Sequence, residues 1–270
     1  MNAAAQPGNV YLAGAGPGDP NLLTLRVLRL LETADLILPD DLVSAEILAM
    51  AHPGAEIIPV GKRCGQPRIT QAEIHMLMLE GVQAGRSVLR LKSGDPLIFG
   101  RAGEEMTALR GAGIPFEVVP GITSAFAAAA RLKTPLTDRS AASKLILATA
   151  HHAAGKLELT PKWAGGLADD ATLVIYMPGR KFRALADDLI ASGIAAGTTC
   201  VAISNATTPD EQIHSTSLVE LEDVDVGPAP VILFVGDAIQ LSDYNEQSLQ
   251  DALSLESASN GSSSTSQASK

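Results

Sequence analysis

The sequence contains few aromatic residues, few cysteines and no long apolar run, and each shortage excludes a class of protein. Phe, Tyr and Trp make up 3% of the 270 residues although 46% of the chain is hydrophobic, so the core must be aliphatic. The two cysteines, Cys64 and Cys200, are far apart and form no CxxC pair. This excludes a disulfide framework and a cysteine-based zinc site, and it suits a reduced cytoplasm. No run approaches the roughly 20 apolar residues of a membrane span.

The N-terminus, MNAAAQPGNV, has neither a basic segment nor an apolar segment of the secretory type, so we expect no secretion. Positive charge is also scarce, because 20 Lys and Arg stand against 30 Asp and Glu, and this argues against nucleic acid as the main partner. Between Ile58 and Lys144, however, 12 Lys and Arg stand against 7 Asp and Glu. A basic segment in an acidic protein favours a local site for a polyanionic small ligand. Alternating charges on solvated helices are the other interpretation of the same count.

Short apolar runs alternate with amphipathic segments along the whole chain. Between the first two runs, apolar residues from Leu23 to Ala34 recur every three to four positions, as in a helix that packs on a sheet. This alternation predicts an α/β fold with a largely parallel sheet. The expected strands are residues 10–13, 36–38, 57–60, 88–91 and 116–119, and then 145–149, 173–177, 199–203 and 231–235.

A polar stretch at 132–143 breaks both patterns and predicts a domain boundary. We therefore expect two α/β domains, residues 9–138 and 139–243, with a ligand cleft between them. Residues 1–8 and the Ser-rich residues 244–270 are expected to be disordered, because a segment like the tail buries too little apolar surface to offset its ordering entropy.

The segment LAGAGPGDPNLLTL, at 12–25, resembles a dinucleotide-binding loop, but three of its features speak against that function. The third glycine of the G-x-G-x-x-G pattern is replaced by Asp19. Pro17 removes a backbone N–H that would have to donate to a phosphate. A carboxylate at the start of a helix also has the wrong sign for an anion, although it is a good helix cap.

Four further loops follow expected strands, where open α/β sheets place their ligands. They are LPDDLVS at 38–44, VGKRCG at 60–65, LKSGDPLIFGRAGEE at 91–105 and VPGITSAFAAAA at 119–130. Asp95 lies in a turn where it can accept hydrogen bonds from a ligand, and Thr123 and Ser124 offer hydroxyls at a helix start. Each loop alone is explained by turn and capping chemistry, but five such loops in order in one domain indicate a site.

These loops, together with PLTDR, TLVIYM and PAPVILFVG, resemble the tetrapyrrole methylase family from about Val10 to Ala238. The resemblance implies an enzyme of two α/β domains that forms a homodimer, binds S-adenosylmethionine in the cleft and uses no metal. It implies two methyl transfers to carbons of uroporphyrinogen III, giving precorrin-2 for sirohaem and corrinoid biosynthesis. Because about eight residues precede the matching segments, we expect no further module before them.

The resemblance also assigns roles to individual residues. Asp40 matches a proton acceptor, Lys62 a proton donor, and Arg101 a position of substrate binding or proton handling. The substrate-binding positions are Arg63, Glu104 and Arg139. The cofactor-binding positions are Pro17, Ser93, Gly94, Asp95, Ile98, Thr123, Ser124, Met177, Ala206 and Ala229.

This chemistry suits those residue types. Methyl transfer needs a carbon nucleophile aligned with the methyl group, and a base must then take a proton from the ring. Arg63, Arg68, Arg101 and Arg139 can hold the substrate's many carboxylates through paired hydrogen bonds.

Three simpler roles compete with these assignments: Asp40 as the cap of a helix near Val43, Lys62 as a surface charge, and Met177 as a core side chain. His151 and His152 are interpreted as surface residues, not as metal ligands.

The chain departs from the family pattern beside Asp40, where Pro39 and Asp41 replace the usual Tyr and Arg. We expect the added carboxylate to raise the proton affinity of Asp40 and to weaken any contact with a substrate carboxylate. Two alternatives to the main prediction remain. One is a family member that acts on a later precorrin or on a protein, and the other is a non-catalytic binding protein on the same scaffold.

Overall fold

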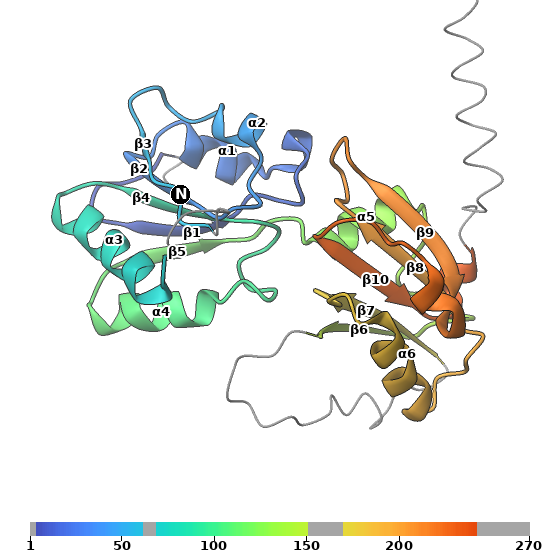
Figure 1. The fold of residues 1–270 in the computed structure, drawn as a ribbon. Helices are drawn as coiled ribbons and strands as arrows, with labels where there is room; N and C mark the ends of the chain where they lie inside the picture. The colour runs from blue at the N-terminus through green and yellow to red at the C-terminus, as the bar shows by residue number, and fades with distance from the viewer. Residues whose placement is uncertain (1–3, 62–68, 151–169, 242–270) are drawn as a thin grey trace, which may run out of the picture. The chain divides into compact units, whose positions relative to one another are not determined.

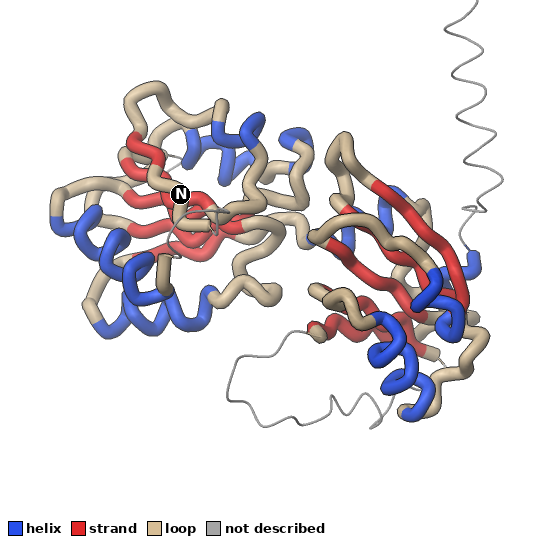
Figure 2. Tube along the Cα trace, viewed as in Figure 1, coloured by secondary structure: helices blue, strands red, loops and turns tan. Residues whose placement is uncertain are grey.

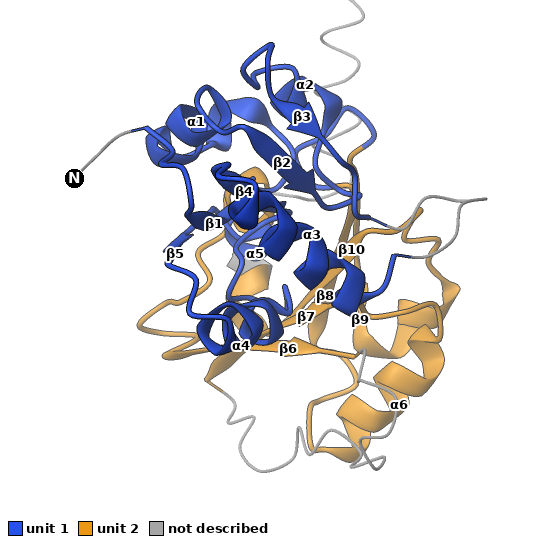
Figure 3. Cartoon of the chain, turned by 90° about the vertical axis from the view of Figure 1, so that its left-hand side faces the viewer, with its two compact units in different colours: residues 1–127, 206–210 blue, residues 128–205, 211–270 orange. Residues whose placement is uncertain are grey.

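The structure is a computed structural model that describes residues 4–61, 69–150 and 170–241. The chain divides into two compact units, coloured separately in Figure 3. Unit 1 comprises Met1–Ala127 and Ala206–Asp210, and unit 2 comprises Ala128–Asn205 and Glu211–Lys270. Each unit contains its own sheet with helices, so the α/β class expected from the sequence is confirmed.

Unit 1 is built on five parallel strands in the order β3-β2-β4-β1-β5. In Figure 1, α1 and α2 cover one face of this sheet and α3 and α4 cover the other, and Figure 2 shows the same layers by element type. The elements are β1 (Val10–Gly14), η1 (Pro20–Leu22), α1 (Leu25–Leu31), β2 (Leu36–Pro39), α2 (Ala45–Leu48), β3 (Glu56–Ile57), α3 (Gln71–Gln83), β4 (Val88–Lys92), α4 (Ala102–Gly111), β5 (Phe116–Val119) and α5 (Ser124–Arg131), within which the two units divide.

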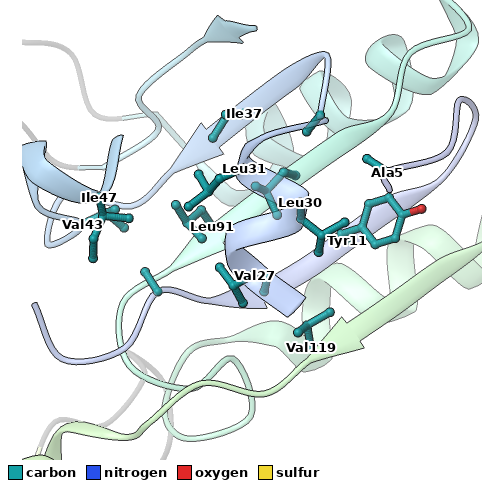
Figure 4. Close-up of a cluster of buried hydrophobic side chains, with 14 residues drawn as sticks. Ala5, Tyr11, Val27, Leu30, Leu31, Ile37, Val43, Ile47, Leu91 and Val119 are labelled. Carbon is teal, nitrogen blue, oxygen red and sulfur yellow. The ribbon is translucent and has the colours of Figure 1, made fainter. Parts of the chain in front are cut away.

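Helices on both faces bury the central strands completely, which is why β1 and β2 appear in the sequence as unbroken apolar runs. Figure 4 shows a core cluster on one face of this sheet, where Val27, Leu30 and Leu31 of α1 pack on Tyr11 and Leu91. The second cluster lies on the opposite face, under α3 and α4.

Residues 4–9, just before β1, pack on unit 1, whereas disorder was expected for residues 1–8; residues 1–3 lie outside the described parts of the chain. Ala5 is buried in the core cluster of Figure 4, and its N–H donates to Thr33 Oγ1 at 2.9 Å. The Gln6 N–H donates to the Tyr11 hydroxyl at 2.9 Å. These contacts offset the ordering entropy of a segment that has little apolar pattern of its own.

Unit 2 contains a mixed sheet in the order β6-β7-β10-β8-β9. Its elements are β6 (Lys144–Thr149), β7 (Ala171–Tyr176), α6 (Phe182–Ala191), β8 (Thr199–Ser204), β9 (Gln212–Ser217), η3 (Leu218–Asp223), β10 (Val231–Val235) and η4 (Asp237–Leu241). Only β6 and β7 pair in parallel among the described strands of this unit, so the expectation of a largely parallel sheet is wrong here. The cause is β9, a polar edge strand that the apolar pattern did not reveal. Among the described residues, no helix has the length and apolar character needed to cross a membrane.

Candidate functional site

The connections of unit 1 indicate a ligand site at one edge of its sheet, by which we mean the edge formed by the carboxyl ends of its parallel strands. From β1 the chain passes over β4 to reach β2, and from β4 it passes over β1 to reach β5. The connections that follow the neighbouring strands β1 and β4 therefore run in opposite directions. Open α/β sheets bind ligands at such a point, outside the carboxyl ends of the strands. The loops that follow β1, β2, β4 and β5 all begin at this edge.

Three glycines bring the loops after β1, β4 and β5 into backbone contact. A Cβ added to Gly14 would lie 2.7 Å from Gly121 Cα, and one added to Gly121 would lie 2.8 Å from Gly14 Cα, with the Gly94 carbonyl closer still to both. Gly16 and Gly94 exchange backbone hydrogen bonds of 3.2 and 2.7 Å. Glycine is required at positions 14 and 121, because a side chain at either would push the neighbouring loops apart.

The same contacts explain why the loop after β1, residues 15–19, does not suit a dinucleotide phosphate. We call this segment the first glycine loop. The Ala15 N–H already donates to the carbonyl at the end of β4, the Gly16 N–H donates to Gly94 O in the following loop, and Pro17 has no N–H. Asp19 caps the short helix η1, where its carboxylate accepts from the Asn21 N–H at 2.8 Å. A phosphate would therefore meet a carboxylate and occupied amides at this loop.

Asp95 holds two of the loops together. Its Oδ1 accepts from the Leu97 N–H at 2.8 Å, and its Oδ2 accepts from the Gly121 N–H at 3.0 Å. Both oxygens are thus used by the backbone, so the carboxylate orders the edge of the site. Ser93 and Ile98 lie half-buried in the same loop, and Thr123 is buried just before α5.

Asp40 follows β2 at the same edge, and its N–H donates to Leu91 O at 2.9 Å. Its side chain is 32% exposed, so one side of the carboxylate is open. The alternative role as a helix cap is wrong, because α2 is capped by Ser44, whose Oγ accepts from the Ile47 N–H.

Beneath Asp40 lie three buried charges, Arg90, Lys92 and Glu105, which we call the β4 charge cluster. Their side chains are at most 2% exposed. Arg90 Nη2 donates to Asp40 Oδ1, and Lys92 Nζ lies 3.8 Å from Asp40 Oδ2. Burial, together with the charge of Arg90, lowers the pKa of Lys92. This cluster was not expected from the sequence. The available signal was a pair of cations two residues apart in an otherwise apolar strand, VLRLK, followed by a glutamate in the next helix.

Arg101 and Glu104, both expected to handle the substrate, form a pair at the start of α4. Arg101 Nε and Nη2 donate to the two Glu104 oxygens at 2.8 and 2.7 Å. The hydrogen bonds from Arg101 hold the pKa of Glu104 below its usual value. Both side chains are about half exposed, so the guanidinium is accessible to a carboxylate from solution.

Residues with strained backbone gather in the segments assigned to ligand binding. Left-handed backbone at residues other than glycine occurs, in the part of the chain that the structure describes, at Phe99, Arg101, Lys133, Met177, Asn205 and Thr207. Apart from Lys133, each is an assigned residue or a direct neighbour of one. Such conformations cost on the order of 1–3 kcal/mol each and are typical of binding and catalytic segments.

Ala206 belongs to unit 1, although the sequence placed it in the second domain. Its segment lies against the first glycine loop. A Cβ added to Gly18 would lie 3.1 Å from Thr208 Cγ2 and 4.0 Å from Ala206 O, and the Asp19 N–H donates to Thr207 Oγ1 at 3.4 Å. This segment thus brings a residue from far along the chain to the same edge of the sheet.

Met177, Ala229 and Arg139 belong to unit 2. Met177 directly follows β7 and Ala229 precedes β10, and the register of Tyr176 opposite Ile232 places both at one end of the second sheet. Met177 is 46% exposed, so its alternative role as a core side chain is wrong. Arg139 is exposed in the turn between Asp138 and Ala142.

Several assigned residues lie outside the described parts of the chain: Lys62, Arg63, Arg68, His151 and His152. Within those parts, no group of three or more His, Cys, Asp or Glu side chains is arranged to hold a metal ion.

Comparison with known proteins extends this picture. Residues 9–222 match the family of Tetrapyrrole (Corrin/Porphyrin) Methylases. The chain is 41% identical over 242 residues to the S-adenosyl-L-methionine-dependent uroporphyrinogen III methyltransferase, chloroplastic, of Arabidopsis thaliana, a match that covers 87% of this chain and 65% of the relative. It is 43% identical to the siroheme synthase of Azotobacter vinelandii, with 87% of this chain and 51% of that protein covered. The chain thus spans between half and two thirds of the length of these curated relatives.

Among solved structures, the chain resembles uroporphyrin-III C-methyl transferase from Thermus thermophilus complexed with S-adenosyl homocysteine. The two are 37% identical, with a TM-score of 0.75, and the match covers 87% of this chain and 100% of that one.

Proposed function

Because the chain belongs to the tetrapyrrole methylase family, we propose that it transfers methyl groups from S-adenosylmethionine to two ring carbons of uroporphyrinogen III, giving precorrin-2. The observation that carries the proposal is the match to the Thermus thermophilus enzyme, whose chain is covered throughout and whose structure contains the demethylated cofactor. The curated relatives with the same activity in their names support the same reaction. The proposal is limited to methyl transfer, since those relatives are longer than this chain.

The edge of the unit 1 sheet suits this cofactor better than a nucleotide phosphate. The N–H groups of Ala15, Gly16 and Asp19 in the first glycine loop are occupied. The residues around the loop are small or uncharged, apart from Asp19 and Asp95, whose carboxylates accept from backbone N–H groups. When bound, S-adenosylmethionine supplies a methyl group on a positively charged sulfur. Pro17, Gly94 and Thr123 are the proposed contacts at this edge, and the assignments of Met177 and Ala229 stay predictions.

Asp40 is the proposed proton acceptor. Once a ring carbon has formed its new bond to the methyl carbon, the tetrapyrrole carries a positive charge until it loses a proton. Arg90 holds one carboxylate oxygen of Asp40, while the partial exposure of the side chain leaves room for a substrate. Arg101 is the proposed contact for a substrate carboxylate, because its planar guanidinium matches that group. The role of Lys62 as a proton donor stays a prediction.

Incubation of the purified protein with S-adenosylmethionine and enzymatically generated uroporphyrinogen III tests the proposal. We expect the tetrapyrrole to gain the mass of one and then two methyl groups. No gain with this substrate, but a gain with a later precorrin, would transfer the activity to another family substrate. Binding of S-adenosylhomocysteine without any turnover would favour a binding protein.

Asp40→Asn tests the mechanism separately. We expect S-adenosylhomocysteine to bind as before, while turnover falls roughly 10²–10⁴-fold because the base is lost. Glu46→Gln is the matched control, since it neutralises an exposed carboxylate of α2 close by in sequence. Full activity of Asp40→Asn would remove Asp40 from the mechanism.

We also propose that the enzyme works as a homodimer in the cytoplasm, as expected from the sequence.

A further inference from the structure

Glu105 is the centre of the β4 charge cluster. Its Oε1 accepts from three donors, Arg90 Nε and Lys92 Nζ at 3.0 Å each and Gln71 Nε2 at 3.1 Å. The Glu105 side chain has no exposed surface, and its Oε2 is buried without a hydrogen-bond partner among the described residues. Glu105 therefore fixes two cations from β4 at positions that water does not reach.

Both cations also face Asp40. Arg90 donates to Asp40 Oδ1, and Lys92 Nζ lies 3.8 Å from Oδ2, so each oxygen has its own positive neighbour. Arg90 is anchored further by a hydrogen bond of 3.0 Å from Nη1 to Leu38 O, near the end of β2 and two residues before Asp40. The orientation of the Asp40 carboxylate is thus set from below by groups that cannot turn toward solvent.

The formal charges of this group balance, since Arg90 and Lys92 are matched by Glu105 and Asp40. Three of the four groups are buried, so a change of one charge is weakly screened, and it acts on the partly exposed member, Asp40. Breaking a buried pair leaves an uncompensated charge, whereas removing both members restores neutrality.

We propose that Glu105, through Arg90 and Lys92, positions Asp40 and sets the pH above which it accepts a proton. The proposal rests on the proposed function, in which Asp40 takes the proton from the methylated ring. Glu105 and Lys92 are positioning residues in this scheme, because they act through Asp40.

Other charged groups near the site are already engaged or lie farther from Asp40. On α4, Glu104 is paired with Arg101. On α3, the His75 ring is 3.3 Å from the Gln71 amide and so reaches the cluster through one side chain. Asp41, the neighbour of Asp40 in its own loop, is exposed.

Titration of the Asp40 carboxylate by ¹³C NMR in the resting protein tests the proposal without any turnover. The Asp40 signal is identified by its absence in Asp40→Asn. Lys92→Met removes a cation, and we expect the titration midpoint to rise by about 1 pH unit; Glu105→Gln removes an anion, and we expect a fall of similar size. In the double variant Lys92→Met/Glu105→Gln, the remaining charges of Arg90 and Asp40 balance again, and the midpoint should return close to that of the unchanged protein.

The opposite signs distinguish this role from a purely structural one, which would lower stability in both variants without moving the midpoint in opposite directions. Gln71→Leu is the control, since it removes a donor to Glu105 but no charge, and the midpoint should stay where it is. If Lys92→Met does not fold, Lys92→Gln keeps a donor for Glu105 and should give the same upward shift.

The acid limb of the pH dependence of kcat/KM should move with the midpoint in each variant. Midpoints that stay fixed, or that move in one direction only, would overturn the proposal even if methyl transfer proceeds normally. An unchanged protein that fails to methylate would instead overturn the proposed function, while the titration would still report on the cluster.

Discussion

Gly121 offers a sharp test of how the loops of unit 1 are held together. The substitution Gly121→Ala adds one methyl group at a position whose φ is not left-handed, so the backbone conformation itself tolerates alanine. The added Cβ would lie 2.8 Å from both Cα and O of Gly14, and closer to the carbonyl oxygen of Gly94. These are all backbone atoms, which cannot rotate out of the way as a flexible side chain can.

Overpacking by a methyl group costs typically 1–3 kcal/mol. Because three loops would have to separate, we expect a loss of about 3 kcal/mol in the free energy of opening, or a roughly hundredfold rise in the opening equilibrium. Native-state hydrogen exchange of the amides in β1 and β4 measures this locally, which avoids treating the two units as one cooperative transition.

Gly103→Ala is the matched control, because an added Cβ there has open space and lies within α4. Gly103 is the second residue of α4, where alanine is tolerated at least as well as glycine, so the protection of β1 and β4 should not fall. If Gly121→Ala leaves the protection of β1 and β4 within about 0.5 kcal/mol of the unchanged protein, the steric explanation for glycine at positions 14 and 121 is refuted.

Three more predictions concern single groups. Asp95→Ala removes the acceptor of two loop amides, and calorimetry should find S-adenosylhomocysteine binding weakened by roughly 2 kcal/mol, about 30-fold; equal affinity would contradict the ordering role. Burial raises the pKa of the Cys200 thiol to about 12, so in a Cys64→Ser background a thiol reagent at pH 8 should react only after unfolding, and prompt labelling would refute that burial. Hydrogen bonds from Ser87 lower the pKa of Asp35, so the stability it adds is present above the ordinary carboxyl range and is lost as the pH falls. Asp35→Asn should therefore destabilise the protein more at pH 7 than at acidic pH, as the free energies of unfolding measured across the carboxyl range would show; an equal loss at every pH would contradict this.

Most strands were predictable because their residues are apolar in unbroken runs. Each expected strand overlaps an observed one, and Val10–Gly14 and Val231–Val235 differ from the prediction by at most one residue. The strand expected at 57–60 is the exception, because β3 is only Glu56–Ile57 and shares one residue with the prediction. β9 was not predictable in this way, because Gln212–Ser217 is polar and lies at the edge of its sheet, where little of it is buried. Without β9, the antiparallel arrangement of unit 2 could not be inferred.

The site residues that lie in sequence motifs were predictable, whereas the contacts that only the fold brings together were not. The sequence placed Asp40 and Asp95 after strands, and the structure puts both at the same edge of one sheet. It did not indicate that Asp95 would be occupied by backbone amides, because its acceptor role for Gly121 depends on strand order. Nor did it indicate that Arg90 and Lys92 would turn inward, since cations in a strand usually mark a solvated face.

The return of Ala206–Asp210 to unit 1 has a consequence for synthesis on the ribosome. Asp19 and Thr207, which join in unit 1, are separated by 188 positions in the chain. At about 5–20 residues per second, the ribosome needs roughly 10–40 s to make that interval. The last strand of its sheet, β5, ends at Val119, so for the final 88 residues of this interval, roughly 4–18 s, the sheet is complete while the first glycine loop still lacks its cover. The first unit to begin folding is therefore completed only after most of the second unit has been translated.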